Sequence, residues 1–225
     1  MNVYYMAIRL LSDATFGRGE GLAGLVNTEI EHDQHGCPFV SGRTLKGLLR
    51  EECRNIHDAM GDSAERWASE AQFLFGISGD TQGEGTASMH IGAAMLPPVL
   101  LRLAHRDVTE KKLTPADLLA SLTTFRRQTA VDAKTEAPAA GSLRTERALI
   151  RDTYLLAQLT FERNPNDRQL ALLSACILAT RRGGLGRNRG RGRLQLRLHD
   201  QIPADYDDET FTRQYFTRFI SEVRS

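Results

Sequence analysis

The feature that most restricts the fold is a segment rich in arginine and glycine, residues 181–193, which reads RRGGLGRNRGRGR. It contains six arginines, five glycines and no acidic residue. A helical pattern ends directly before it, and an alternating, strand-like pattern over residues 194–198 follows it. We therefore expect a cationic loop that is anchored at both ends. The alternative is a disordered linker of the Arg-Gly type.

This loop has the chemistry of a phosphate-binding segment. Glycine lets the main chain approach a phosphate closely, and arginine adds bidentate, charge-assisted contacts. The glycine spacing does not match a Walker A loop, because no Gly-Lys-Ser/Thr follows. It does not match a dinucleotide fingerprint either, since that motif should follow a strand and open a helix. The loop therefore has phosphate-binding chemistry without either nucleotide-binding motif.

The overall charge hides a polarised distribution. The 225 residues include 29 Lys and Arg against 28 Asp and Glu, a formal net charge of +1. Acidic residues are concentrated away from the Arg/Gly segment, at positions 51–52 and 207–209. A near-neutral total is therefore compatible with a strongly basic surface.

Composition predicts an ordinary globular protein of the cytoplasm. No apolar run is long enough to span a bilayer, and the N-terminus lacks the order of a signal peptide. The three cysteines cannot all pair, and they do not suggest a disulfide framework.

The order of elements predicts an α+β fold. Strand patterns cover residues 2–11, 87–95, 153–161 and 194–198, and a long irregular loop covers residues 12–38. Helices are expected from Thr44, over residues 65–75, near residues 115–122, after an Asn164-Pro165 start, and at the C-terminus. This order predicts a single ferredoxin-like (RRM-like) domain over residues 1–225, with large loop insertions including a thumb-like hairpin.

The first long helix has one basic face. Arg43, Lys46, Arg50 and Arg54 are spaced so that they project within a narrow sector, away from the leucine face. This pattern suits phosphate binding, and it is also typical of a solvated surface helix.

Four segments resemble one family. Residues 38–50, PFVSGRTLKGLLR, are similar to the P-x-I-P-G-S-S-L-K-G-x-x-R signature of the RAMP superfamily of CRISPR proteins, and residues 74–76 resemble the L-F-G that follows it. Residues 129–135 and 141–146 resemble the I-D-R-x-T thumb of repeated type III backbone subunits. Residues 183–193 are similar to the G-G-x-R-S-R-G-x-G loop. The matches occur in family order.

The resemblance implies a specific role. Such subunits stack along a CRISPR RNA guide, hold its backbone, and bring complementary target RNA, other Cas subunits and further copies of themselves into an antiviral ribonucleoprotein filament. The thumb, here residues 129–148, inserts between nucleotides. The RNA-binding residues implied by the helix, the thumb and the Arg/Gly loop are Arg43, Lys46, Arg50, Arg54, Asp132, Lys134, Thr135, Arg144, Gly183, Gly184, Arg187, Arg189 and Arg191.

The resemblance leaves cleavage of target RNA in doubt. Family members that cut carry an aspartate in the first loop, and the corresponding place here is Val26-Asn27. An amide cannot act as a general base or bind Mg²⁺ as a carboxylate does. The nearby carboxylates Glu29, Glu31 and Asp33 are weak candidates. We expect cleavage to be lost or weak, with no cofactor unless Mg²⁺ supports cutting.

No metal site is expected. His32, His35, Cys37, Cys53 and His57 could supply zinc ligands in principle, but their spacing matches no standard zinc motif.

Two other roles remain open within the same family. One is a stand-alone endoribonuclease that processes guide precursors, with His32, His35 or Tyr154 as candidate catalytic groups. The other is a capping subunit at a filament end, a class that usually lacks the thumb.

Overall fold

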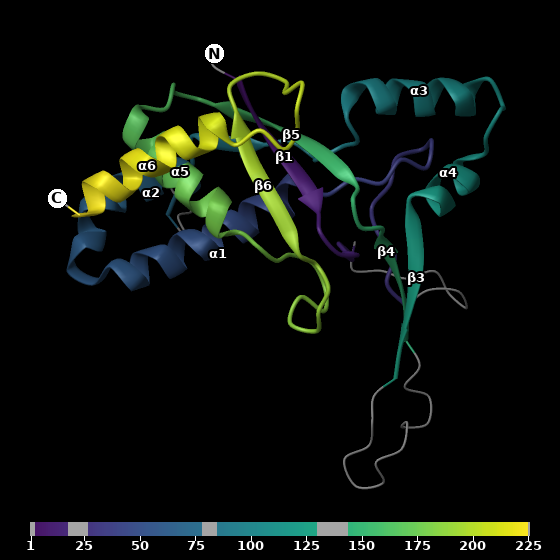
Figure 1. The fold of residues 1–225 in the computed structure, drawn as a ribbon, viewed down its shortest axis with the longest axis horizontal. Coiled ribbons are helices and arrows are strands. Elements are labelled where there is room, and N and C mark those ends of the chain that lie inside the picture. The colour runs from purple at the N-terminus through teal and green to yellow at the C-terminus, as the bar shows by residue number, and fades with distance from the viewer. Residues whose placement is uncertain (1–2, 18–26, 78–84, 130–143, 225) are drawn as a thin grey trace, which may run out of the picture.

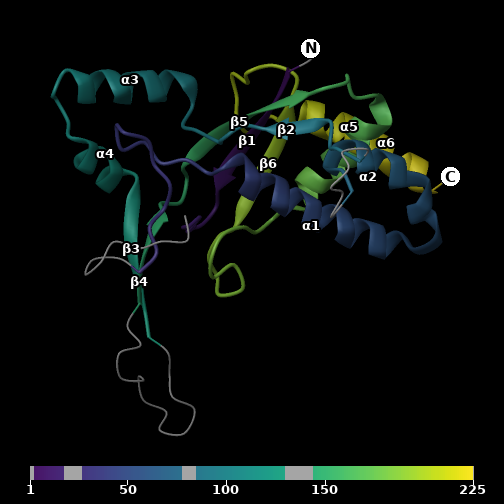
Figure 2. The same ribbon diagram turned by 180° about the vertical axis from the view of Figure 1, so that it is seen from behind.

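The computed structural model describes residues 3–17, 27–77, 85–129 and 144–224 (Figures 1 and 2). Its centre is a four-stranded sheet in the order β2-β5-β1-β6, in which all neighbouring strands are antiparallel. The strands are β1 (Val3–Leu10), β2 (Met89–Ile91), β5 (Tyr154–Phe161) and β6 (Leu194–His199). With one helix after β1 and one after β5, this order is that of a ferredoxin-like fold, as predicted.

The helices of this core gather at one side of the molecule (Figure 1). The crossing helices α1 (Gly42–Met60) and α5 (Asp167–Ala179) contact each other, and α2 (Ala68–Phe75) and α6 (Thr210–Arg224) also pack against α5. A 3₁₀ helix, Gly61–Trp67, joins α1 to α2. None of the helices in the described part of the chain has the length and apolar character needed to cross a bilayer.

The core follows from strand alternation. Met6, Ile8 and Leu10 of β1 point to the helices and are at most 1% exposed, and the predicted face of β5 from Leu155 to Phe161 is equally buried. All residues of α5 from Leu170 to Ile177 are buried, because the helix lies between the sheet and the other helices.

Three expectations about elements were wrong. Helix α5 begins two residues later than predicted, because Asn166, not Asn164, caps it through a reciprocal capping box with Gln169. A whole helix, α3 (Pro98–Thr109), precedes α4 (Pro115–Ser121), where only the latter was expected. Strand β2 has three residues in place of a predicted nine-residue range.

Side chains cover the outer strands of the sheet. At the β6 edge, the Leu198 N–H donates to the Thr212 hydroxyl, which in turn donates to the Leu198 carbonyl, and the Arg197 guanidinium donates to the Leu196 carbonyl. At the β2 edge, Lys46 Nζ donates to the Met89 carbonyl over 2.7 Å. These main-chain groups are therefore not available for pairing with a further strand.

The insertion between β2 and β5 forms the opposite side of the molecule (Figures 1 and 2). It contains α3, α4 and a two-stranded antiparallel ribbon of β3 (Thr123–Gln128) and β4 (Arg144–Leu149). This ribbon is the stem of the predicted thumb-like hairpin, and it begins earlier than expected, at Thr123. Residues 130–143 of the thumb lie outside the described residues.

Candidate nucleic-acid interface

The Arg/Gly loop is an ordered loop with a closed neck, which excludes the linker interpretation. Arg182 and Arg193 form a β-bridge, and the N–H of Leu194 donates to the carbonyl of Arg181. One residue further into the loop on each side, the N–H of Gly183 donates to the carbonyl of Gly192 over 2.9 Å. The two ends of the loop, which follow α5 and precede β6, are therefore hydrogen-bonded to each other.

Glycine is required here by close approaches within the chain. Gly184 and Gly192 have φ of 80° and 68°, in the left-handed region. A Cβ on Gly192 would lie 2.0 Å from the Gly183 carbonyl oxygen, and one on Gly184 would lie 2.6 Å from that of Thr15. Gly183 is buried. Of the two glycines predicted to contact phosphate, Gly183 thus gives its N–H to the neck of the loop, while Gly184 makes no main-chain bond through its N–H within the described residues.

A groove lies between this loop and the stem of the thumb-like hairpin. Its volume is about 760 Å³, and both segments line it. A smaller hollow of about 280 Å³ shares Gln128, Arg189 and Arg191 with it and extends along β3. Two segments far apart in sequence therefore form one cation-lined surface. The arginines around the two hollows are Arg126, Arg127, Arg144, Arg187, Arg189 and Arg191.

Ion pairs hold the walls of this groove in place. Arg187 donates to both carboxylate oxygens of Glu51 on α1, at 2.9 and 2.8 Å, and this pairing lowers the pKa of Glu51. Arg191 lies 3.1 Å from Glu146 of β4, and Arg126 of β3 pairs with Asp13. The three pairs tie the loop to the helix, the loop to the hairpin, and the hairpin to the end of β1.

The other three groove arginines have no acidic partner among the described residues. Arg127 and Arg144 are exposed, and the side chain of Arg189 makes only a 3.4 Å hydrogen bond to Gln128 within the described residues. Six arginines thus face three carboxylates, which leaves a formal excess of three positive charges in the described part of the groove. Such an excess favours a polyanion.

The basic face of α1 is less free than its spacing suggests. Lys46 is bonded to Met89, and burial followed by repulsion from Arg50 lowers its pKa. Arg50 donates to the Gly76 carbonyl over 3.0 Å. Arg43 and Arg54 are exposed and make no ion pair within the described residues. On this face, Lys46 and Arg50 therefore bind main-chain carbonyls of the fold, whereas Arg43 and Arg54 face solvent.

The three candidate catalytic carboxylates have structural partners or lie apart from the groove lining. Glu29 is 1% exposed and pairs with Arg147 over 2.7 Å. Asp33 accepts from the N–H groups of His35 and Cys37, and Glu31 is half-buried beside a main-chain bond to Phe39. None of the three lines the groove.

Asn27, at the place of the expected aspartate, is hydrogen-bonded to the hairpin. Its side-chain oxygen accepts from the Thr145 N–H over 2.7 Å, and its own N–H donates to the Thr145 carbonyl over 2.8 Å. Val26 lies outside the described residues. The amide therefore pairs with β4 as another strand would.

The five possible zinc ligands are not brought together. Cys53 contacts Cys176 in the core, Cys37 is buried, and His57 is exposed on α1. The candidates for guide processing are also dispersed: the Tyr154 hydroxyl donates to Asp207, His35 stacks on His105, and His32 bonds within its own turn.

Sequence reasoning missed the residues of β3. Phe125 is 51% exposed, with the Arg147 guanidinium 4.5 Å from its ring centre, and Arg126 and Arg127 follow it. The signal available in the sequence was an aromatic residue followed directly by two arginines, a combination that suits binding of single-stranded nucleic acid. Of the predicted thumb residues, Asp132, Lys134 and Thr135 lie outside the described residues, and Arg144 begins β4 at the groove.

A model of the RAMP superfamily matches residues 7–195, from the middle of β1 to the start of β6. The chain belongs to the RAMP superfamily. This confirms the resemblance found in the signature, the L-F-G and the Arg/Gly loop. No curated protein matches the sequence.

Solved structures with the same fold agree with this assignment. A chain of the cryo-EM structure of type III-B Cmr-beta in the apo state matches this RAMP protein with a TM-score of 0.58 and 12% identity, covering 90% of this chain and 99% of that one. A chain of type III-B Cmr-beta bound to cognate target RNA matches with a TM-score of 0.61 and 11% identity, covering 88% and 97%. At this identity the likeness establishes the fold.

Proposed function

We propose that this RAMP protein is a guide-RNA-binding backbone subunit of a type III or type III-related CRISPR ribonucleoprotein. The groove between the Arg/Gly loop and the hairpin stem holds the phosphates of a single RNA strand. The observation that carries the proposal is the excess of unpaired arginines in that groove. The RAMP membership and the fold shared with chains of type III-B Cmr-beta support it.

The groove suits binding without sequence selection. Arginine contacts to phosphate fix the register of a strand but carry no information about its bases. The exposed N–H groups of a glycine-rich loop add further donors to phosphate oxygens. A subunit that must accept any guide sequence needs this kind of contact.

In this proposal the subunit cuts target RNA weakly or not at all. The amide of Asn27 is bound to Thr145, and Glu29 is enclosed with Arg147. Metal-assisted attack on a phosphate needs an ionised carboxylate at the scissile position. Mg²⁺ would be required only if cutting occurs.

The test is RNA binding as a function of salt concentration. We expect the wild-type protein to bind single-stranded RNA with an affinity that falls steeply as salt rises. The double variant Arg144→Glu, Arg189→Glu should bind roughly a hundredfold more weakly. The slope of log affinity against log salt should decrease by about 1.4, because each phosphate that an arginine neutralises accounts for about 0.7. Fluorescence anisotropy with a labelled oligonucleotide measures both quantities.

The control is Arg102→Glu on α3, an exposed arginine outside the groove and without an ion pair among the described residues. It should leave affinity within about twofold of wild type. Equal losses in the groove and control variants would reject the groove as the RNA site.

A second experiment separates the alternatives. Gel filtration of the protein with RNA of increasing length should give species whose size grows with RNA length. A guide-processing endoribonuclease would stay small and leave cut RNA, and a capping subunit would bind one copy per RNA end. Sequencing the RNA that co-purifies from a host with a CRISPR array tests for repeat-derived guides.

A further inference from the structure

A second polar cluster lies where the first loop meets the insertion, and none of its residues lines the groove. It consists of Asp33 and His35 from the first loop and His105 from α3, and in Figures 1 and 2 this helix lies far from the Arg/Gly loop. The possible ligand atoms of the three side chains lie within 4.8 Å of one another. This is the one such group of three or more His, Cys, Asp or Glu among the residues that the structure describes.

The carboxylate of this cluster is fixed in position. Asp33 Oδ1 accepts from the N–H groups of His35 and Cys37, both over 2.9 Å, and Oδ2 lies 2.6 Å from His105 Nε2. The turn is closed by the Asp33 N–H to the Cys37 carbonyl over 2.9 Å. It is also pressed against α4, since a Cβ on Gly36 would lie 2.0 Å from the Pro115 carbonyl oxygen. The backbone thus supplies the outer contacts that orient a metal-binding carboxylate.

One ring nitrogen in the cluster has no partner. His35 stacks on His105 with ring centres 4.1 Å apart, and its Nδ1 is buried without a hydrogen bond within the described residues. A buried ring nitrogen without a partner costs free energy, unless another group binds it. A metal ion would satisfy this atom and would replace the hydrogen bond between Asp33 and His105.

We propose that Asp33, His35 and His105 bind one divalent transition metal ion of the zinc type. Two imidazole nitrogens and one carboxylate oxygen are a donor set that Zn²⁺ accepts, with water in the fourth position. Small rotations of the two histidines from their stacked arrangement bring three ligands to one ion. Cys37 does not join the set, because its sulfur is not among the ligand atoms that lie within 4.8 Å of one another.

The ion has a structural role in this proposal. It joins the loop over residues 31–38, which leads into the signature turn and α1, to α3 of the insertion. The groove arginines come from other elements, so the ion is not placed to take part in RNA cleavage. The inference therefore does not depend on the proposed function.

The experiment uses the full chain without a polyhistidine tag, stripped with a chelator and titrated with Zn²⁺ by calorimetry, with Co²⁺ absorption as a report on coordination. We expect one ion per chain. The variants His105→Gln and His35→Gln should weaken Zn²⁺ binding on the order of a hundredfold. His105→Gln keeps a hydrogen-bond donor for Asp33, so the turn is preserved. Zn²⁺ should raise the melting temperature of the wild type but not of these variants.

The matched control is His57→Gln, which changes an exposed histidine on α1. It should bind Zn²⁺ as tightly as the wild type. Absence of one-to-one binding by the wild-type chain would overturn the proposal, and so would His105→Gln and His35→Gln variants that bind with unchanged affinity.

Discussion

The groove and the outer face of the central sheet both carry arginines, yet they differ in how those arginines are paired. On the sheet, Arg9 donates to Asp152 and Asp207, and Arg197 pairs with Glu209. In the groove, half of the arginines have no acidic partner among the described residues. Pairing, rather than the presence of arginine, therefore decides which surface of this RAMP protein can attract RNA.

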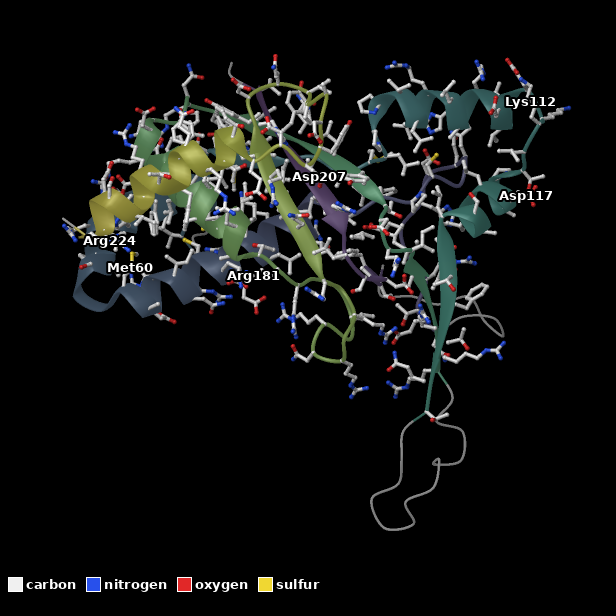
Figure 3. All side chains as sticks on the ribbon, viewed as in Figure 1. Met60, Lys112, Asp117, Arg181, Asp207 and Arg224 are labelled. Carbon is white, nitrogen blue, oxygen red and sulfur yellow. The ribbon has the colours of Figure 1, made fainter. Side chains whose placement is uncertain are left out.

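The acidic segment after β6 folds back over the outer face of the sheet. Figure 3 labels Arg181, where the Arg/Gly loop begins, and Asp207, whose carboxylate accepts from Arg9 of β1, the residue paired with Gln195 near the start of β6. RRM domains bind RNA on the exposed face of a sheet of this kind, through aromatic side chains. Here the hydroxyl of Tyr154 on that face donates to Asp207 over 2.7 Å. The acidic segment over residues 205–209 thus occupies the surface that an RRM would offer to bases.

The largest effect, a loss of stability, should come from removing the ion pair that attaches the hairpin to the first loop. Glu29→Ala leaves Arg147 enclosed without its partner, and we expect a loss of about 3 kcal/mol in the free energy of unfolding, measured by urea denaturation. Glu29→Gln keeps an acceptor for Arg147 and should lose less. Unchanged midpoints for both variants would contradict the role of this pair.

A smaller effect should come from the exposed aromatic ring of β3, the strand that lines the smaller hollow. Phe125→Ala should weaken binding of single-stranded RNA roughly tenfold, since stacking of one base on an aromatic contributes about 1–3 kcal/mol. Phe125→Trp should bind as well as the wild type. Tyr5→Ala, on the sheet face, should leave affinity unchanged, and a loss equal to that of Phe125→Ala would remove the distinction between the two surfaces.

A gain of binding is expected when the sheet face is released from its acid. Asp207→Asn removes the charge that neutralises Arg9, and anisotropy should show roughly threefold tighter RNA binding at low salt. Asp58→Asn makes the same charge change at an exposed position of α1 and is the control. Equal gains in the two variants would mean that net charge alone is responsible.

The smallest effect concerns the geometry of the loop. Arg187→Lys keeps the charge but loses the two-point pairing with Glu51, and RNA affinity should fall about twofold. Arg193→Lys, in the neck of the loop and without a side-chain hydrogen bond or ion pair among the described residues, should show no change beyond error in the same titration.

The sequence predicted the core better than the insertion. Alternation along β1 and β5 and the Arg/Gly loop between α5 and β6 are local patterns, and the structure confirms them. Helix α3 was missed because Val99, Leu100 and Leu103 are exposed, so its apolar residues do not mark a buried face.

The site could be predicted only in part. The Arg/Gly loop and Arg144 at the start of β4 were identified, because their residue types carry the chemistry, whereas β3 was missed. Which arginines are free could not be predicted, since Glu51, Glu146 and Asp13 reach them from distant elements. The cluster of Asp33 with His105 joins residues 72 positions apart, and no spacing rule reveals such a contact.

The covered edges of the central sheet have a consequence for assembly. With Thr212 and Arg197 bonded to β6 and Lys46 bonded to β2, neither outer strand offers a free ladder to a second molecule. In the proposed assembly along an RNA, neighbouring copies would meet through loops and side chains, whose contacts separate more readily than a continuous main-chain pairing. Crowded copies of this protein should then add and leave one at a time, without merging their sheets into an insoluble fibre.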